Sequence, residues 1–404
     1  MPVTAAVFAA PLQGHFKRIR PLVESLAQAG VRVVVLTDGR FESDAKRLGA
    51  GFVDLYAGRP IDGVDAVSIP MSCRFVSFAG RYGDDIVGEM RALRPSLVVH
   101  DTFSVIGRVV AHHLAVPRVN VCAGHNLEPR RIIEAVHRDL AVRISESCEE
   151  AAAALRERHG IPDASPFTYV SARSPDLNIY CEPEEFLPPV ARGPFEPIAF
   201  FGSVRPEDAV RSDVPVFPSA GGRVPAVRVY ASFGTIVWHH FEAVALSALE
   251  ALSEHLSGRD DASAVVSLGG RAVEGRAAAL ARPNVRVMSY VDQWQALGEA
   301  TACLTHHGLS STHEAIFGGV PMLSYPFFWD QPGLAARCGE LGLAVPLTTT
   351  LRGPVDSIMI DAALARIEES RTVLRARLAD ARQWELDTIR RRPDVIRRIM
   401  EFVS

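Results

Sequence analysis

The residues that could do chemistry gather in one stretch of this 404-residue chain, positions 290–331. Within it, an apolar run ends at His306 and Gly308, and the hydroxyl residues 310–312 follow. That order is typical of a strand that turns into a helix. Backbone N–H groups at a helix N-terminus carry about half a positive charge and bind phosphate, and hydroxyl and imidazole groups can add hydrogen bonds. Ser311 and Glu314 also fit an S-x-x-E capping box, which is compatible with an anion site.

A second candidate pair lies in the first hundred residues. His15 ends the loop PLQGH, and Asp101 ends the apolar run SLVVHD. An imidazole titrates near neutral pH and can take a proton from a hydroxyl, and a carboxylate behind it fixes its tautomer. Both residues have a simpler alternative as caps of the helices expected from Phe16 and Phe103. His100 is expected on the opposite face of its strand and is interpreted as structural.

Two shorter motifs complete the set. Ser232-Phe233-Gly234-Thr235 follows an apolar run, and a glycine there would allow close approach of the backbone to a phosphate that Thr235 could also bind. By itself this motif is equally typical of an ordinary turn between a strand and a helix. Asp330 and Gln331 precede Pro332, so they could bind a polar ligand or simply begin a helix.

The elements that must position these residues follow an alternating pattern. Apolar runs of four to eight residues alternate with segments of helical periodicity, which predicts βαβ units and a parallel sheet. In the first half we expect strands at 3–10, 31–37, 96–101, 118–122, 177–181 and 198–202, with helices at 16–29, 103–114 and 131–159. In the second half we expect strands at 227–233, 264–268, 285–289, 302–305 and 322–325, with helices at 241–256, 293–299, 311–317 and 333–341.

The pattern therefore predicts an α/β protein with two doubly wound, Rossmann-like domains that face each other across a cleft. We expect a first domain at 1–205, a Pro- and Gly-rich linker at 206–225, a second domain at 226–385 and a C-terminal helix at 386–404. In such sheets ligands bind at the carboxyl ends of the strands, where the motifs above lie.

Composition excludes several other classes. Lys and Arg number 43 against 47 Asp and Glu, so the net charge of −4 gives no sign of a nucleic-acid-binding face. The six cysteines form no C-x-x-C pair, which argues against a zinc ribbon or a disulfide scaffold and suits the cytoplasm. No apolar run has the length of a membrane span, and the chain has no P-loop or G-x-G-x-x-G motif.

The stretch 290–331 resembles the donor-binding signature of family 1 nucleotide-sugar glycosyltransferases, which have the GT-B fold. The plant form runs W-x-P-Q, H-C-G-W-N-S-T-x-E and D/E-Q. This chain keeps the residues Gln293, His306, Gly308, Ser311, Thr312, Glu314, Asp330 and Gln331. It has Tyr290 and Asp292 for the Trp and Pro, His307, Leu309 and Ser310 for Cys, Trp and Asn, and Leu334 near a further Asn. The segment DQPGLAAR also resembles bacterial carotenoid glucosyltransferases.

The resemblance implies a role for each matching residue. His306, Gly308, Ser310 and Ser311 would bind the donor diphosphate, as would Gly234 and Thr235. Tyr290, Gln293 and Glu314 would contact the nucleoside, with Glu314 on the ribose hydroxyls. Asp330 and Gln331 would bind the donor sugar. The family also has a Gly-His at the end of its first loop, where the His is the base, and an Asp that matches Asp101.

The function expected from this resemblance is inverting, metal-independent transfer of a sugar from a UDP- or TDP-sugar to a hydroxyl of a small hydrophobic acceptor. Natural-product or antibiotic biosynthesis would use such an enzyme, and no cofactor is expected. Phe75, Phe78 and Tyr82 could line an acceptor pocket, although they could equally belong to the core. Two alternatives stay open, a nucleotide-sugar epimerase or hydrolase on the same fold and a non-catalytic nucleotide-sugar-binding relative.

Overall fold

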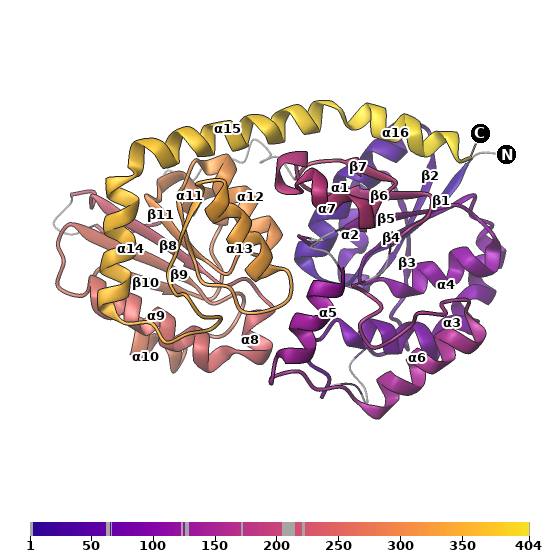
Figure 1. Cartoon of the computed structure of the whole chain (residues 1–404), viewed down its shortest axis with the longest axis horizontal. Helices are drawn as coiled ribbons and strands as arrows, with labels where there is room; N and C mark the ends of the chain where they lie inside the picture. Colours follow the sequence, from indigo (N-terminus) through magenta and orange to yellow (C-terminus); the bar gives the residue numbers. More distant parts are fainter. Residues whose placement is uncertain are drawn as a thin grey trace. The chain divides into compact units, whose positions relative to one another are not determined.

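The computed structural model describes residues 3–61, 65, 67–122, 124–125, 129–170, 173–203, 215–219 and 223–403. The chain divides into two units (Figure 1). Unit 1 comprises Met1–Ser203 and Leu386–Ser404, and unit 2 comprises Val204–Glu385. Most of the linker expected at 206–225 lies outside the described residues. None of the helices in the described part of the chain is long and apolar enough to cross a membrane.

The sheet of unit 1 is parallel, with the strand order β3-β2-β1-β4-β5-β6-β7. Its inner strand β1 (Thr4–Phe8) is buried throughout, as expected for a strand covered by helices on both faces. The order of the strands reverses between β1 and β4, which creates a switch point where ligands bind in such sheets. The other strands are β2 (Arg32–Thr37), β3 (Gly51–Asp54), β4 (Leu97–Asp101), β5 (Arg118–Cys122), β6 (Leu177–Tyr180) and β7 (Ile198–Phe200).

The helices of unit 1 differ from the sequence predictions at two places. Helix α1 (Gln13–Gln28) begins three residues before Phe16, so His15 lies in its first turn. Apolar periodicity could not show this turn because the turn contains no apolar residue. The single helix expected at 131–159 is instead two, α5 (Pro129–Arg138) and α6 (Glu146–Arg158), and the Ser145 hydroxyl caps the second of them.

Several elements of unit 1 were not predicted. They are β3, the short α2 (Glu42–Arg47) and the long α3 (Cys73–Leu93), which follows a loop and packs against α4 (Val105–Leu114) and α6. The remaining short helices are η1 (Gly39–Phe41), η3 (Glu184–Phe186), α7 (Pro189–Arg192) and η4 (Gly193–Phe195).

Unit 2 has a parallel sheet of strand order β10-β9-β8-β11-β12-β13. Right-handed crossovers from its central strand β8 place α9 and α10 on one face and α11, α12 and α13 on the other (Figure 1). The strands are β8 (Val227–Ser232), β9 (Ala262–Ser267), β10 (Val285–Met288), β11 (Ala302–Thr305), β12 (Met322–Ser324) and β13 (Ala344–Pro346). The helices are α8 (Val237–His240), α9 (Glu242–Leu256), α10 (Arg276–Leu280), α11 (Gln293–Glu299), α12 (Leu309–Gly318), α13 (Gln331–Glu340) and α14 (Ser357–Glu369).

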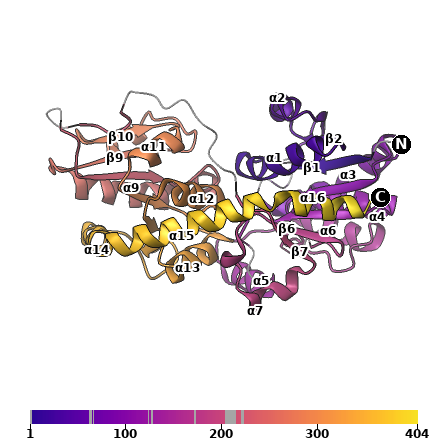
Figure 2. The ribbon, with the colours of Figure 1, turned by 90° about the horizontal axis from the view of Figure 1, so that it is seen from above.

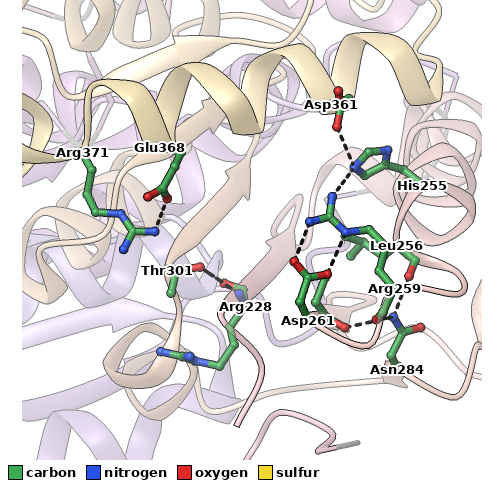
Figure 3. Close-up of polar contacts among 11 residues, drawn as sticks. Arg228, His255, Leu256, Arg259, Asp261, Asn284, Thr301, Asp361, Glu368 and Arg371 are labelled. Atoms are coloured by element: carbon green, nitrogen blue, oxygen red, sulfur yellow. Dashed lines mark hydrogen bonds and ion pairs between the residues drawn. The ribbon is translucent and has the colours of Figure 1, made fainter.

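The connection from α9 to β9 is held by one side chain. Asn284 Nδ2 donates to the carbonyl oxygens of Leu256, Arg259 and Ala262, at 2.6, 3.1 and 3.0 Å (Figure 3). Close to it, Arg259 and Asp261 form a paired contact at 3.0 and 3.1 Å on the exposed side of the same turn. The Asn284 amide therefore replaces the backbone partners that the end of a helix leaves missing.

The chain returns to unit 1 within a helix. Helix α15 (Arg371–Arg390) contains the division between the units at Glu385, and α16 (Arg392–Glu401) belongs to unit 1 and contacts α1 (Figure 2). Arg392 donates to the carbonyl oxygen of Phe201 at 2.8 Å, and Arg398 donates to that of Ile198 at 2.9 Å. Helix α16 is thus tied to strand β7, about two hundred residues earlier in the sequence.

Candidate active site

The most sharply defined pair in unit 1 is His15 with Asp101. The His15 Nδ1 atom lies 3.0 and 2.9 Å from the two carboxylate oxygens of Asp101. A carboxylate only accepts hydrogen bonds, so Nδ1 carries the proton and Nε2 keeps the free lone pair. Asp101 is completely buried, whereas the His15 side chain is 13 % exposed. The imidazole can therefore receive a proton at Nε2 while Asp101 orients it.

The position of each partner follows from the sheet. Asp101 is the last residue of β4 and His15 lies in the first turn of α1, directly after β1. Because β1 and β4 are neighbouring parallel strands, their carboxyl ends bring the two side chains together. Asp101 is not the N-cap of α4, because that helix begins at Val105 after Ser104. His100 bonds instead to the Asp101 carbonyl through Nδ1, at 3.1 Å.

Phe103 is a residue of this site that the sequence did not reveal. Its backbone N–H donates to Asp101 Oδ1 at 2.7 Å, and its ring lies against the His15 imidazole, with the ring centroids 4.3 Å apart. The ring thereby restricts the imidazole on one side while the N–H stabilises the carboxylate. No sequence motif marks Phe103, although its place two residues after a strand-end Asp is typical of an Asx turn.

The three aromatic residues suggested for an acceptor pocket lie on α3. Phe75 and Phe78 are 3 % and 2 % exposed, so in this structure they belong to the core of unit 1. Phe75 stacks on Phe103 with centroids 5.8 Å apart, which connects it to the surroundings of His15. Tyr82 packs against Phe78 at 5.1 Å and is partly exposed. Phe75 is thus the member of the three that lies nearest to the pair of His15 and Asp101.

In unit 2, the turn from β11 to α12 brings together the residues suggested for the diphosphate. His306 is buried within this turn. Helix α12 begins after its N-cap residue Gly308, which has no side chain and so forms no side-chain cap. The capping box considered for Ser311 and Glu314 is therefore absent. A Cβ atom added at Gly308 or Gly234 would collide with the His306 ring. The two glycines are needed for that ring to lie against the backbone of both turns.

The electrostatics of this turn depend on burial. Burial lowers the pKa of His306 to about 4, so its ring is neutral near pH 7. Its Nδ1 atom is buried and has no hydrogen-bond partner among the described residues. An anion at this turn would thus meet backbone N–H groups and a neutral imidazole. Thr235 is exposed in the neighbouring turn, after Gly234 with its positive φ of 66°.

The residues suggested for the nucleoside form a connected network. Gln293 Nε2 donates to Glu314 Oε2 at 2.6 Å, and Gln293 Oε1 accepts from Ser311 Oγ at 3.4 Å and from the Tyr230 hydroxyl at 3.3 Å. Tyr230 was not identified from the sequence, because it contacts the motif from a different strand. Tyr290 precedes this network and is 65 % exposed, so its ring face is open to contact.

Asp330 and Gln331 lie together at the start of α13. Both are 5 % exposed, and Gln331 Oε1 accepts from the backbone N–H groups of Phe327 and Phe328, at 2.9 and 3.3 Å. The Gln331 side chain therefore fixes the loop after β12 through its carbonyl. Asp330 is the N-cap residue of α13 but makes no side-chain capping bond. The fully buried Leu334 occupies the position near which the plant signature has an Asn.

The site residues thus fall into two groups. Unit 1 brings together His15, Asp101 and Phe103. Unit 2 brings together the turn at 306–311, the Gln293–Glu314 network and the loop that leads to Gln331, all at the carboxyl ends of its strands. One group contains a base that is oriented by a carboxylate, and the other contains a helix N-terminus suited to an anion.

Comparisons with known proteins agree with this architecture. Residues 254–386 match the family model "Erythromycin biosynthesis protein CIII-like, C-terminal domain". The NDP-glycosyltransferase YjiC of Bacillus licheniformis is 22 % identical over 348 residues, which cover 84 % of this chain and 83 % of that protein. Among solved structures, the glycotransferase of kitacinnamycin matches with a TM-score of 0.79 and 21 % identity over the whole of both chains. The spinosyn rhamnosyltransferase SpnG, complexed with thymidine diphosphate, matches with a TM-score of 0.64 and 18 % sequence identity, and the match covers 97 % of this chain and 99 % of that chain.

The fold and the matches together define the class. The α/β prediction of two Rossmann-like sheets is confirmed, and the similar structures are GT-B glycosyltransferases. These findings support a glycosyltransferase that resembles the family 1 type and is similar to natural-product enzymes.

Proposed function

We propose that this glycosyltransferase moves a sugar from a nucleoside diphosphate sugar, with uracil or thymine as the base, to a hydroxyl of a small hydrophobic acceptor. The observation that carries the proposal is the bonding of His15 Nδ1 to both oxygens of the buried Asp101. That contact leaves Nε2 as a lone pair able to accept the acceptor's proton. A positioned base of this kind contributes about 10²- to 10⁴-fold to a rate.

The proposed reaction is a single displacement. His15 Nε2 takes the acceptor hydroxyl proton as the oxygen attacks the anomeric carbon, and the bond from that carbon to the diphosphate oxygen breaks. Attack from the face opposite the leaving group inverts the anomeric configuration. Asp101 stabilises the imidazolium that forms, and no metal ion is needed in this scheme.

The donor would be held by unit 2. The diphosphate would lie at the N-terminus of α12, where His306, Gly308, Ser310 and Ser311 meet it, with Gly234 and Thr235 from the turn after β8. The N–H groups there would stabilise the charge that develops on the leaving diphosphate. Tyr290 would stack on the base and Glu314 would take ribose hydroxyls, while Asp330 and Gln331 would bind the sugar. The thymidine diphosphate in the similar SpnG structure supports a nucleoside diphosphate as this ligand.

Release of nucleoside diphosphate tests the reaction. The enzyme is incubated with UDP- and TDP-sugars, with and without a panel of hydrophobic alcohols and phenols. We expect release that depends on the acceptor. Release without an acceptor would instead indicate a hydrolase, and binding without release would indicate a non-catalytic relative.

Two variants test the roles in unit 1. We expect His15→Ala to lower kcat by about 10²-fold or more while the donor affinity stays within about twofold, because the base acts only in the transition state. Asp101→Asn should also lower kcat, since an amide can leave the imidazole in the wrong tautomer. Calorimetric titration with the diphosphate measures the affinity. Unchanged turnover in His15→Ala would remove His15 from the scheme.

A further inference from the structure

The residue between the two proposed phosphate-binding positions has an unusual backbone. His307 follows His306 and precedes Gly308, and its φ is +58°. A side chain with a Cβ atom rarely adopts this conformation, which glycine adopts freely. The turn nevertheless has a histidine here, so other contacts must hold its backbone in place.

The hydrogen bonds of the His307 ring stabilise this backbone conformation. The residue is completely buried, its Nε2 atom lies 2.7 Å from Ser324 Oγ, and its Nδ1 atom lies 3.2 Å from Thr312 Oγ1. Ser324 is the last residue of β12, and Thr312 is in the first turn of α12. Each hydroxyl can donate or accept, so a neutral ring satisfies both contacts in either tautomer. The ring therefore links the end of a strand to the beginning of the helix.

The backbone of His307 is fixed as well. Its N–H donates to Thr305 Oγ1 at 3.2 Å, so both the backbone and the ring of His307 are bonded to neighbouring elements of unit 2. Its neighbours in the chain depend on this anchor. The His306 ring lies against Gly308, where a Cβ atom could not be accommodated, so a rotation at His307 would displace both.

We propose that His307 is a positioning residue that holds the turn from β11 to α12 in the shape that receives the donor diphosphate. The inference rests on the proposed function, since it concerns the same anion. Because His307 is completely buried, it would act through its neighbours rather than by touching the substrate. Its ring fixes the direction of the His306 imidazole and of the first N–H groups of α12, both of which would contact the phosphates.

The test compares diphosphate with monophosphate binding. Affinities for UDP, UMP, TDP and TMP are measured by calorimetry for the full-length protein. For each base, the ratio of the diphosphate affinity to the monophosphate affinity reports what the second phosphate adds. His307→Gly removes the ring but suits the positive φ. We expect a folded His307→Gly to lose at least tenfold in diphosphate affinity and most of the ratio, beyond the lower thermal midpoint that the loss of a buried ring causes. A purely structural role for His307 would lower the midpoint and leave the ratio unchanged.

A second variant keeps the proposal testable if His307→Gly does not fold. Ser324→Ala removes only the partner of Nε2 and should reduce the ratio about threefold. Its matched control is Ser263→Ala, a fully buried serine of β9 whose Oγ has no partner in the described structure, for which we expect an unchanged ratio. An unchanged ratio in Ser324→Ala, or in a folded His307→Gly, would overturn the inference alone. A wild-type protein that binds neither diphosphate would overturn the proposed function and the inference with it.

Discussion

The histidine side chains of this protein differ mainly in whether their surroundings favour the charged or the neutral imidazole. His15 is partly exposed and bonded to a carboxylate, so a positive charge on it has a partner. Burial lowers the pKa of His306 to about 4 and that of His100 to about 3, so neither is charged near neutral pH. The same side chain thus suits proton transfer at one position and neutral hydrogen bonding at another.

The lowered pKa of His306 predicts how stability changes with pH. The unfolded chain binds a proton near pH 6.5 and the folded protein only near 4, so between these values the unfolded state holds more protons. Stability gained by the neutral ring is therefore complete above about pH 6.5 and is lost as the pH falls towards 4. One such group contributes at most about 1.4 kcal/mol per pH unit.

We expect His306→Gln to make the decline in the urea midpoint between pH 7 and 5 less steep than in the wild type. His100 also contributes to the slope, so part of it should remain. The exposed His239 provides the control, and His239→Gln should keep the wild-type slope. A slope that His306→Gln leaves unaltered would contradict the pKa direction.

At the residue scale, the sequence predicted which residues belong to the site and where they lie better than it predicted which residues they contact. His15 and Asp101 were expected together because both lie at the carboxyl ends of strands that share one edge of a sheet. Phe103 and Tyr230 were not expected, because contacts of a ring or a hydroxyl across elements leave no spacing in the chain. The positive φ of His307 was also invisible, since a glycine would ordinarily mark such a position.

The helices and strands are fixed partly by single side chains at their ends. Asn284 is the clearest case, because its amide donates to three carbonyl oxygens between α9 and β9 (Figure 3). The exposed pair of Arg259 and Asp261 lies on the same turn. Its contribution should be smaller, since water competes with an exposed ion pair.

We expect Asn284→Ala to lower the free energy of unfolding by about 2 kcal/mol, because partly buried carbonyls lose their donor. Asp261→Asn should cost less than about 1 kcal/mol and serves as the control. Urea unfolding of both variants, followed by circular dichroism, measures the difference. Equal losses in the two variants would show that Asn284 does not hold this connection.

The ends of helices were predicted least well where polar residues interrupt the apolar periodicity or where that periodicity continues across a loop. The first turn of α1 has no apolar residue, so the helix was expected to begin at Phe16. The break between α5 and α6 was missed because the residues around it retain an apolar periodicity. The strands β8 and β11 agree with expectation to within one residue, since their apolar runs end at sharp turns.

At the scale of the whole chain, unit 1 is discontinuous in sequence. Its last helix, α16, follows the whole of unit 2, and its Ile399 side chain is completely buried. The contacts of Arg392 and Arg398 with the backbone around β7 add hydrogen bonds to that packing. The stability of β7 should therefore depend on residues about two hundred positions away.

We expect Ile399→Ala to destabilise unit 1 by about 2–4 kcal/mol, since it leaves a cavity in a closed core. Hydrogen exchange should then become faster in β6 and β7, with little change in the strands of unit 2. Ile358→Ala is the control, because that side chain is 77 % exposed. Equal loss of protection in both units would argue against a local role for α16.

The late position of α16 also orders events during synthesis on a ribosome. All of unit 2 emerges before residues 386–403 do. Unit 2 can therefore fold while the surface of unit 1 that packs against α16 is still exposed to solvent. The unit that contains His15 would then mature last. Unit 2 could then be folded before unit 1 is complete, and chaperones would encounter unit 1 without its last helix.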